Sequence, residues 1–178
     1  MQPIEAITLS EPAICFEEEY LRLAAEFDQA GEDFPNSHWP GEEFTAFVWR
    51  VRGYSRGVNL PRGWVPFTTF WLIKNGATIL GISDLRHRLN PSLEVVGGHI
   101  GYVIRPSQRR KGYGTLILAR TLVKAKDLGL TRVLLTCDSD NTGSARIIEK
   151  NGGILTREFF YSPTGKMKSH YWIPLREE

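Results

Sequence analysis

A short basic, glycine-rich stretch contains the residue types of this chain that most directly indicate chemistry. Arg109, Arg110 and Lys111 bring three positive charges together, and Gly112 and Gly114 follow them. Glycine lets a ligand approach the backbone closely because it has no Cβ. A helical apolar pattern begins at Gly114, and a helix starting here points its free N–H groups and its positive dipole end at the turn. These residues predict a site for an anionic, phosphate-bearing ligand.

This turn has three alternative interpretations. A simple solvated basic turn is one alternative. The dinucleotide-binding pattern G-x-G-x-x-G lacks its third glycine, because position 117 is isoleucine. The P-loop pattern is also absent, because no Gly-Lys-Ser or Gly-Lys-Thr follows Gly114. What remains is the spacing Arg109-x-x-Gly112-x-Gly114, set three residues after Pro106.

This spacing resembles the acyl-CoA signature Q/R-x-x-G-x-G/A of the GNAT superfamily of N-acetyltransferases. Ile104-x-Pro106 is similar to the V-x-P strand end that precedes the family's turn. Asn141-x-x-Ser144, after the apolar stretch 133–137, resembles the family's second cofactor-contact region. The resemblance implies an acetyl-CoA-dependent N-acetyltransferase. Its acceptor would be the primary amine of a small molecule, amino acid or peptide, attacking directly in a ternary complex.

The resemblance also implies roles for individual cofactor-binding positions. Backbone groups of Tyr102 and Ile104 are expected along the pantetheine arm of acetyl-CoA, like an added strand. The Tyr102 N–H is the expected oxyanion donor. Asn141 and Ser144 are expected on the far side of the cofactor, with helix capping as their alternative role. The amides expected to wrap the pyrophosphate are those of Arg109, Arg110, Lys111, Gly112, Tyr113, Gly114 and Thr115.

The general base is left open by the sequence. An alkyl amine with a pKa near ~10 is protonated at neutral pH, so its proton needs an acceptor. The family often uses a glutamate on the strand before the turn, and the matching position here is Gly98. Asp84, His87 and His99 are the candidate catalytic residues. Their alternative roles are an ion pair with a neighbouring arginine for Asp84, a solvated strand end for His87 and structural packing for His99.

A second departure concerns the acid that protonates the leaving thiolate. Many family members have a tyrosine at the position that is Ile148 here. Water or another tyrosine (Tyr113, Tyr161 or Tyr171) would have to replace it. Together with Gly98, this departure supports one alternative function, a catalytically weak CoA-binding sensor or regulatory domain.

The acceptor site is expected near an arginine- and tryptophan-containing segment over residues 50–66. Such residues present cations to an acceptor carboxylate or phosphate. The alternative is a surface loop held by arginine–carboxylate pairs. The candidate substrate residues are Arg56, Trp64, Arg86, Arg88 and Asn90.

Hydrophobic periodicity predicts the elements that position these groups. Helices are expected over 15–29, 42–52, 114–127 and 144–150. Strands are expected over 4–9, 67–74, 78–86, 95–105, 132–137, 154–161 and 168–174, with 132–137 buried and parallel; residues 89–93 are expected to be a loop. This order implies an α/β (α+β) fold in one domain over 1–178, with a mixed, mostly antiparallel sheet of about six to seven strands and helices on both faces.

The composition is that of an ordinary globular protein. The 178 residues are 42% hydrophobic and 24% charged, with a formal net charge of +2. The near-neutral charge argues against nucleic acid and anionic membrane as partners. The two cysteines show no metal or redox spacing and no signal peptide is evident, so a cytoplasmic location is expected. The aromatic final hairpin is compatible with a homodimer or with core packing.

Overall fold

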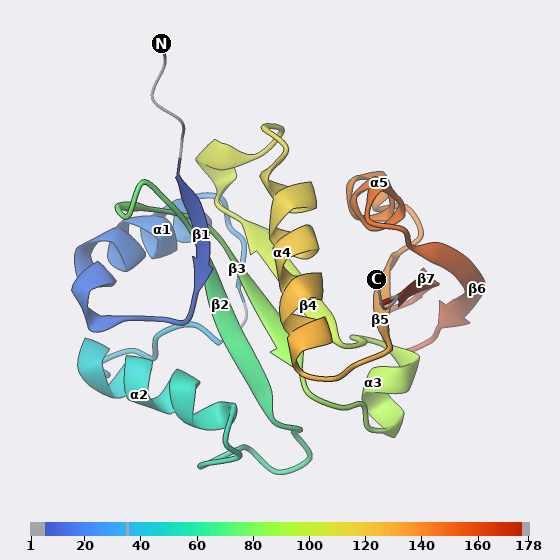
Figure 1. The fold of residues 1–178 in the computed structure, drawn as a ribbon, viewed down its shortest axis with the longest axis horizontal. Helices are drawn as coiled ribbons and strands as arrows, with labels where there is room; N and C mark the ends of the chain where they lie inside the picture. Colours follow the sequence, from blue (N-terminus) through green and yellow to red (C-terminus); the bar gives the residue numbers. More distant parts are fainter. Residues whose placement is uncertain (1–5, 35, 176–178) are drawn as a thin grey trace.

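The computed structural model describes residues 6–34 and 36–175 and contains two antiparallel sheets (Figure 1). The strand order is β1-β2-β3-β4 in the first sheet and β5-β7-β6 in the second. The strands are β1 (Ile7–Ser10), β2 (Phe67–Lys74), β3 (Thr78–Arg86), β4 (Ile100–Ile104), β5 (Arg132–Asp138), β6 (Ile154–Tyr161) and β7 (Lys166–Pro174). The helices are α1 (Glu17–Gln29), α2 (Phe44–Tyr54), α3 (Pro91–Val95), α4 (Tyr113–Asp127) and α5 (Thr142–Lys150), with short 3-10 turns η1 (Ile14–Phe16) and η2 (Pro106–Gln108).

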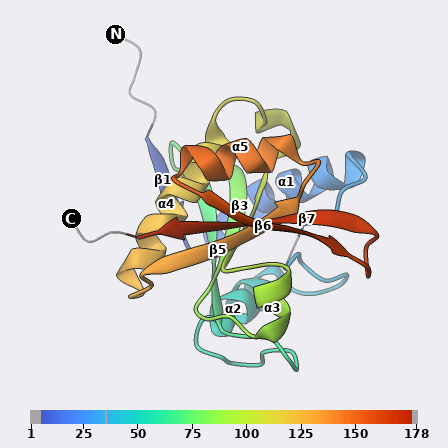
Figure 2. The same ribbon diagram turned by 90° about the vertical axis from the view of Figure 1, so that its right-hand side faces the viewer.

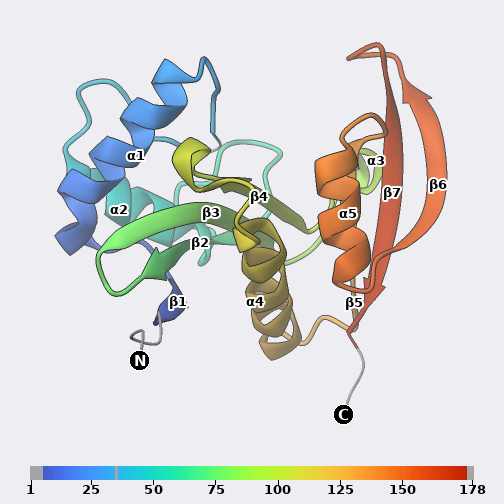
Figure 3. The same cartoon turned by 90° about the horizontal axis from the view of Figure 1, so that it is seen from above.

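Helices cover both faces of the first sheet, which confirms the expected fold class. One cluster of buried side chains joins α1 and α2 to β2 and β3. Two other clusters pack against α4 on the opposite face. Figure 3 shows this layering from above, with α1 and α2 on one side of the sheet and α4 on the other. Figure 2 shows α5 running along the second sheet. The first predicted strand began at residue 4, and its first two residues lie outside the described ones.

The segment before β4 differs from the prediction. The expected strand over 95–105 begins only at Ile100, and part of the expected loop 89–93 belongs to α3. Asn90 caps this helix, because its Oδ1 accepts a hydrogen bond from the Leu93 N–H at 2.9 Å, and Pro91 fits the first helical position. Gly97 and Gly98 then adopt φ angles of +113° and +62°. The apolar pair at 95–96 therefore ends a helix rather than beginning a strand.

The two sheets meet where β4 and β5 begin to separate. The His99 N–H donates to the Leu134 carbonyl at 2.7 Å, and the Leu134 N–H donates to His99 Nδ1 at 2.9 Å. A Cβ at Gly98 would overlap the Leu134 carbonyl, so the close approach requires glycine. β5 pairs along its length with β7 in antiparallel fashion, which corrects the prediction of a parallel strand. The candidate site lies in the gap that opens between β4 and β5 beyond this junction.

Candidate active site

The turn before α4 presents a row of free backbone donors. Gly112 is the N-cap residue of α4 with φ +85°, and Arg110 also has a positive φ of 63°. The Leu116 N–H donates to the Gly112 carbonyl at 3.2 Å. In the described part of the chain, no hydrogen bond is donated by the amides of residues 110–115. Such a turn at a helix N-terminus is suited to binding phosphate.

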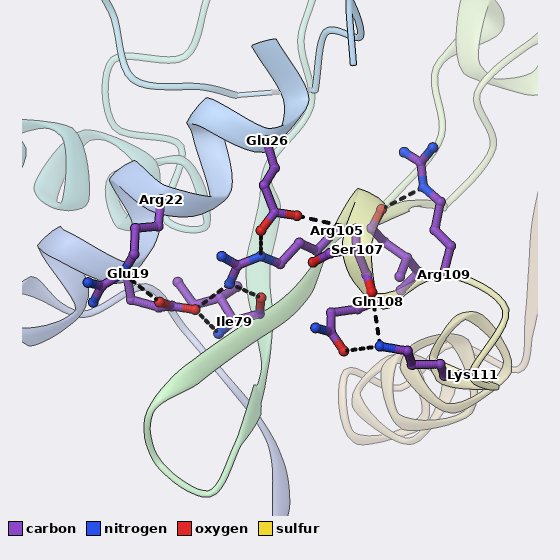
Figure 4. Close-up of polar contacts among 10 residues, drawn as sticks. Glu19, Arg22, Glu26, Ile79, Arg105, Ser107, Gln108, Arg109 and Lys111 are labelled. Atoms are coloured by element: carbon purple, nitrogen blue, oxygen red, sulfur yellow. Dashed lines mark hydrogen bonds and ion pairs between the residues drawn. The ribbon is translucent and has the colours of Figure 1, made fainter. Parts of the chain in front are cut away.

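Two of the three basic side chains of this turn are occupied within the protein. Arg109 donates to both carboxylate oxygens of Glu32, at 2.8 and 2.6 Å, and its Nε donates to the Ile104 carbonyl at 3.1 Å. Lys111 Nζ donates to the Ser107 carbonyl at 2.9 Å (Figure 4). These side chains therefore shape the turn, and its anion-binding capacity resides mainly in the backbone.

A charged network fastens the turn to α1. Arg105, which is 8% exposed, donates to Glu26 at 2.7 Å and to Glu19 at 2.5 Å. Glu26 also accepts the Ser107 N–H at 3.2 Å. Figure 4 shows the arginine lying between the two glutamates of α1, directly before the turn. These side chains are not expected to touch the ligand; their network fixes the position of η2.

A groove of about 370 Å³ lies between the diverging strands β4 and β5. The ladder between β3 and β4 determines which N–H groups of β4 are free. The Arg105 N–H donates to the Leu80 carbonyl, and the Arg86 N–H donates to the His99 carbonyl. Along an antiparallel ladder, hydrogen-bonded pairs alternate with non-bonded pairs. In the register that joins them, Ser83 faces Tyr102 as a non-bonded pair, so the Tyr102 N–H points away from β3. The side chains lining the groove include those of Arg86, Tyr102, Cys137, Asn141, Ser144 and Ile148.

Two polar groups in the groove bear on the expected cofactor contacts. The Tyr102 hydroxyl is buried and makes no hydrogen bond of normal geometry among the described residues. Burial raises its pKa to about 12, and the nearby Ser144 side chain opposes that shift. Asn141 Oδ1 accepts the Ser144 N–H at 3.0 Å, so Asn141 caps α5 as well as lining the groove. An orphaned buried donor calls for a missing partner. The free amides, the open strand edge and this hydroxyl together fit a phosphate-bearing ligand with an extended arm.

A second pocket of about 350 Å³ lies beside β3 and contains Asp84. Its carboxylate is 4% exposed and accepts hydrogen bonds from Thr69 Oγ1 and Asn36 Nδ2, both at 2.6 Å. Burial raises the pKa of Asp84 to about 6. Among the described residues Asp84 makes no ion pair, so the arginine pairing considered from the sequence is not observed. The pocket is lined by Asn36, Gly63, Trp64, Val65, Phe67, Asp84, Arg86, Asn90, Ser92 and Leu93.

The groove and the pocket meet at Arg86, which lines both. Its Nη1 donates to the Gly97 and Gly98 carbonyls at 3.2 and 3.1 Å. A Cβ on Gly101 would lie 3.9 Å from its guanidinium nitrogens, and Gly101 is also the register partner of Asp84. Burial lowers the pKa of Arg86 and the Asp84 charge opposes that shift. Asp84, Arg86 and Tyr102 therefore lie at neighbouring register positions of β3 and β4, with Arg86 common to both cavities.

The structure does not bring the two histidines to this point. His87 Nε2 lies 2.8 Å from Thr68 Oγ1, and His99 Nδ1 accepts the Leu134 N–H. Burial lowers the pKa of His87, and it lowers that of His99 to about 4. Neither lines the groove or the pocket. His99 is therefore placed as a structural link between β4 and β5.

The candidate substrate residues divide into two groups. Trp64, Arg86 and Asn90 line the pocket, and Asn90 also ties its wall together by donating to the Gly63 carbonyl at 2.9 Å. Arg56 and Arg88 are exposed and line neither cavity.

Several residues around the site were not predicted. Asn36 and Thr69 hold Asp84, and Glu32 holds Arg109. Thr69 could have been predicted from the sequence. The β2–β3 hairpin pairs it with Asp84, and paired residues point to the same face of a sheet. No local signal marks Asn36 or Glu32, which reach the site from the loop after α1.

Comparison with known proteins agrees with this geometry. Residues 17–154 match the model of the acetyltransferase (GNAT) domain, and the chain belongs to this family. It is an acyltransferase, and the co-substrate of the family is acetyl-CoA. No curated protein matches the chain.

Solved structures share the fold at low identity. An N-acetyltransferase from Staphylococcus aureus Mu50 is 16% identical, with a TM-score of 0.61 over 96% of this chain and 99% of that chain. A spermidine N-acetyltransferase SpeG chimera from Vibrio cholerae and hSSAT is 16% identical, with a TM-score of 0.61 over 94% of this chain and 96% of that chain. The microcin C7 self-immunity acetyltransferase MccE, in complex with acetyl-CoA and AMP, is 18% identical, with a TM-score of 0.65 over 94% and 92%. Within residues 6–34 and 36–175, no helix has the length and apolar character to cross a membrane.

Proposed function

We propose that this protein is an acetyl-CoA-dependent N-acetyltransferase acting on the primary amine of a small molecule, an amino acid or a peptide. The observation that carries the proposal is the meeting of the groove and the Asp84 pocket at Arg86. Two substrates bound in these adjoining cavities have their reacting ends at one place, which is what catalysis by proximity requires. The structural similarity to a spermidine N-acetyltransferase and to an acetyltransferase complexed with acetyl-CoA supports the same reaction class.

The chain's own groups fit acetyl-CoA. The amides of residues 110–115 would hold the pyrophosphate, and the β4 edge at Tyr102 and Ile104 would hold the pantetheine arm. Asn141 and Ser144 line the same groove. Bound acetyl-CoA supplies the thioester, whose acetyl carbon forms a bond to the acceptor nitrogen as its carbon–sulfur bond breaks. The Tyr102 N–H would stabilise negative charge on the acetyl oxygen.

Asp84 is the base that we propose for the acceptor ammonium. It is the only carboxylate among the described residues that is classed as fully buried, and it faces the acceptor pocket. With a pKa raised to about 6, it is ionised at neutral pH and closer to the amine in basicity than an exposed carboxylate. The ammonium proton passes to the Asp84 carboxylate, and the neutral amine then attacks. The nitrogen loses its second proton to water as the amide forms, and the departing thiolate takes up a proton from water.

Direct transfer between the two substrates agrees with the groups in the groove. Cys137 lines it and is the one cysteine that could form an acetyl-enzyme there. Burial raises the pKa of its thiol to about 11, which keeps it protonated and poorly nucleophilic at neutral pH. A ternary complex therefore explains the groove better than a covalent intermediate on this residue.

Calorimetric titration with acetyl-CoA, followed by a thiol-release assay with primary amines, tests the proposal. The unmodified protein is expected to bind acetyl-CoA and to release CoA only when an amine is supplied. Gly112→Val is expected to abolish binding, whereas Gly129→Val is its matched control at the other end of α4. Both glycines have φ near +85° and open space around the Cβ position, so the two changes strain the backbone alike. Equal binding by both variants would reject the phosphate turn, and binding without turnover would indicate the sensor alternative.

A further inference from the structure

The acceptor pocket contains one negative and one positive side chain in an otherwise uncharged lining. Asp84 and Arg86 are two residues apart on β3 and both face the pocket, so their Cα atoms are about 7 Å apart along the strand. The apolar part of the lining comes from Trp64, Val65, Phe67 and Leu93. Trp64 is 50% exposed and packs 5.8 Å from the Phe67 ring, so it forms an aromatic wall at the mouth.

The two charges do not neutralise each other. In the described chain no ion pair within 4.0 Å joins Asp84 to Arg86. Arg86 uses Nη1 for two backbone carbonyls, and no described residue accepts a hydrogen bond from its Nε or Nη2. A half-buried guanidinium with unused donors favours an anionic acceptor from a ligand. The pocket therefore presents a separated pair of opposite charges.

We propose that the acceptor is a free amino acid with an apolar side chain, a proposal that rests on the N-acetyltransferase function above. Its ammonium lies at Asp84, its carboxylate at Arg86 and its side chain against Trp64, Phe67 and Leu93. The pocket volume of about 350 Å³ is at the low end of the range for small-molecule sites, about 300–1,000 Å³. A polyamine would place a second ammonium near Arg86, and a peptide N-terminus lacks a carboxylate beside its amine.

Six acceptors test this assignment in the thiol-release assay at saturating acetyl-CoA. The probes are L-phenylalanine and L-leucine, their carboxamides, 2-phenylethylamine and spermidine, so that the carboxylate and the side chain are removed separately. We expect kcat/KM for a free amino acid to exceed that of its carboxamide by about ten- to a hundredfold, the value of a hydrogen bond to a charged group. Equal or faster turnover of the carboxamides, the simple amine or spermidine would overturn the proposal. Acetyl-CoA binding with no turnover of any probe would overturn the N-acetyltransferase function as well.

Variants of Arg86 separate recognition from a structural role. Arg86→Gln is expected to lower kcat/KM for the amino acid by about ten- to a hundredfold and to change the value for the carboxamide by less than about threefold. Arg62→Gln is the matched control, since Arg62 is exposed and next to the pocket without lining it. An equal loss for both acceptors would show that Arg86 only holds the turn at Gly97 and Gly98.

A binding measurement completes the test because Arg86→Gln also removes two hydrogen bonds to backbone carbonyls. Calorimetric titration of the amino acid into protein loaded with CoA reports recognition without chemistry. Arg86→Lys keeps the positive charge but loses the planar fork of donors, so weakened binding is expected there too. Thermal unfolding of both variants shows whether they fold. Undiminished amino-acid binding by a folded Arg86→Gln protein would refute the carboxylate contact.

Discussion

Replacing Asp84 by asparagine is expected to stabilise the protein at pH 8 while nearly abolishing its activity. The folded-state pKa of about 6 lies roughly two units above the ordinary value of 3.8. The folded protein therefore holds a proton on Asp84 between these values while the unfolded chain does not. Stability falls as pH rises through this window, and the penalty is complete above about pH 6. Two units correspond to about 3 kcal/mol, an upper limit on the gain at pH 8 for a neutral amide. The Thr69 hydroxyl can rotate to accept from that amide.

The lowered pKa of His99 makes stability depend on pH in the opposite direction over nearly the same pH range, so the variant and the unmodified protein should differ in their whole pH profile. Its pKa is lowered to about 4, so the unfolded chain binds the additional proton between about pH 4 and 6.5 and stability rises with pH there. In the unmodified protein the two contributions nearly cancel. In Asp84→Asn the His99 contribution is left, and the free energy of unfolding should rise by about 3 kcal/mol across this window.

Urea unfolding of both proteins between pH 4 and pH 8 measures the difference directly. The variant's advantage should shrink as the pH falls from 6 towards 4, because the folded protein then holds a proton on Asp84 and the unfolded chain begins to take one up. In the activity assay, kcat/KM should fall about 10²- to 10⁴-fold, and the acidic limb near pH 6 should disappear. A variant that is no more stable than the unmodified protein at pH 8, or that keeps this limb, would refute both the raised pKa and the role of Asp84 as base.

Three further changes test the framework around the site. Arg105→Met leaves Glu19 and Glu26 without their buried partner. Urea unfolding should therefore show a loss of about 3 kcal/mol in the free energy of unfolding, and calorimetry should show a weaker affinity for acetyl-CoA. An unchanged affinity would show that this network does not affect binding at the turn. Gly98→Ala forces a Cβ into the Leu134 carbonyl at a positive φ and should cost about 3 kcal/mol, whereas Gly165→Ala, at a similar φ in open space, should cost about 1 kcal/mol. Alkylation at pH 8, followed by mass spectrometry, should modify exposed Cys15 faster than Cys137, and acetyl-CoA should protect only Cys137.

The parts of the fold that were predicted well are those with local causes. The β2–β3 hairpin was predicted with the observed bounds because Asn75 and Gly76 adopt left-handed φ angles of 52° and 64°, which these residue types favour. The turn before α4 was likewise visible, because glycine spacing and the start of a helix are local features. Strand alternation further places Asp84 and Arg86 on the same face of β3.

The remaining features of the site depend on contacts between distant parts of the chain. Asp84 is held by Asn36, 48 residues away, and Arg109 is held by Glu32, 77 residues away. Periodicity carries no information on such pairs. The late start of β4 was missed for a different, local reason: the side chain of Asn90 and the ring of Pro91 outweigh the strand preference of the apolar residues that follow.

The glycine at position 98 is the departure from the family pattern for which the structure gives a physical reason. The hydrogen bond between His99 and Leu134 brings the backbones together where the two sheets meet, and no side chain fits at Gly98 in this arrangement. A glutamate at that position would require β4 and β5 to separate. The base that we propose, Asp84, accordingly lies on another strand, β3, which is hydrogen-bonded to β4 along this stretch. Asp84 faces Gly101 in that register, one residue before the Tyr102 N–H. The junction that leaves no room for a side chain at Gly98 lies beside the groove, and Asp84 is the buried carboxylate of the pocket that adjoins this groove at Arg86.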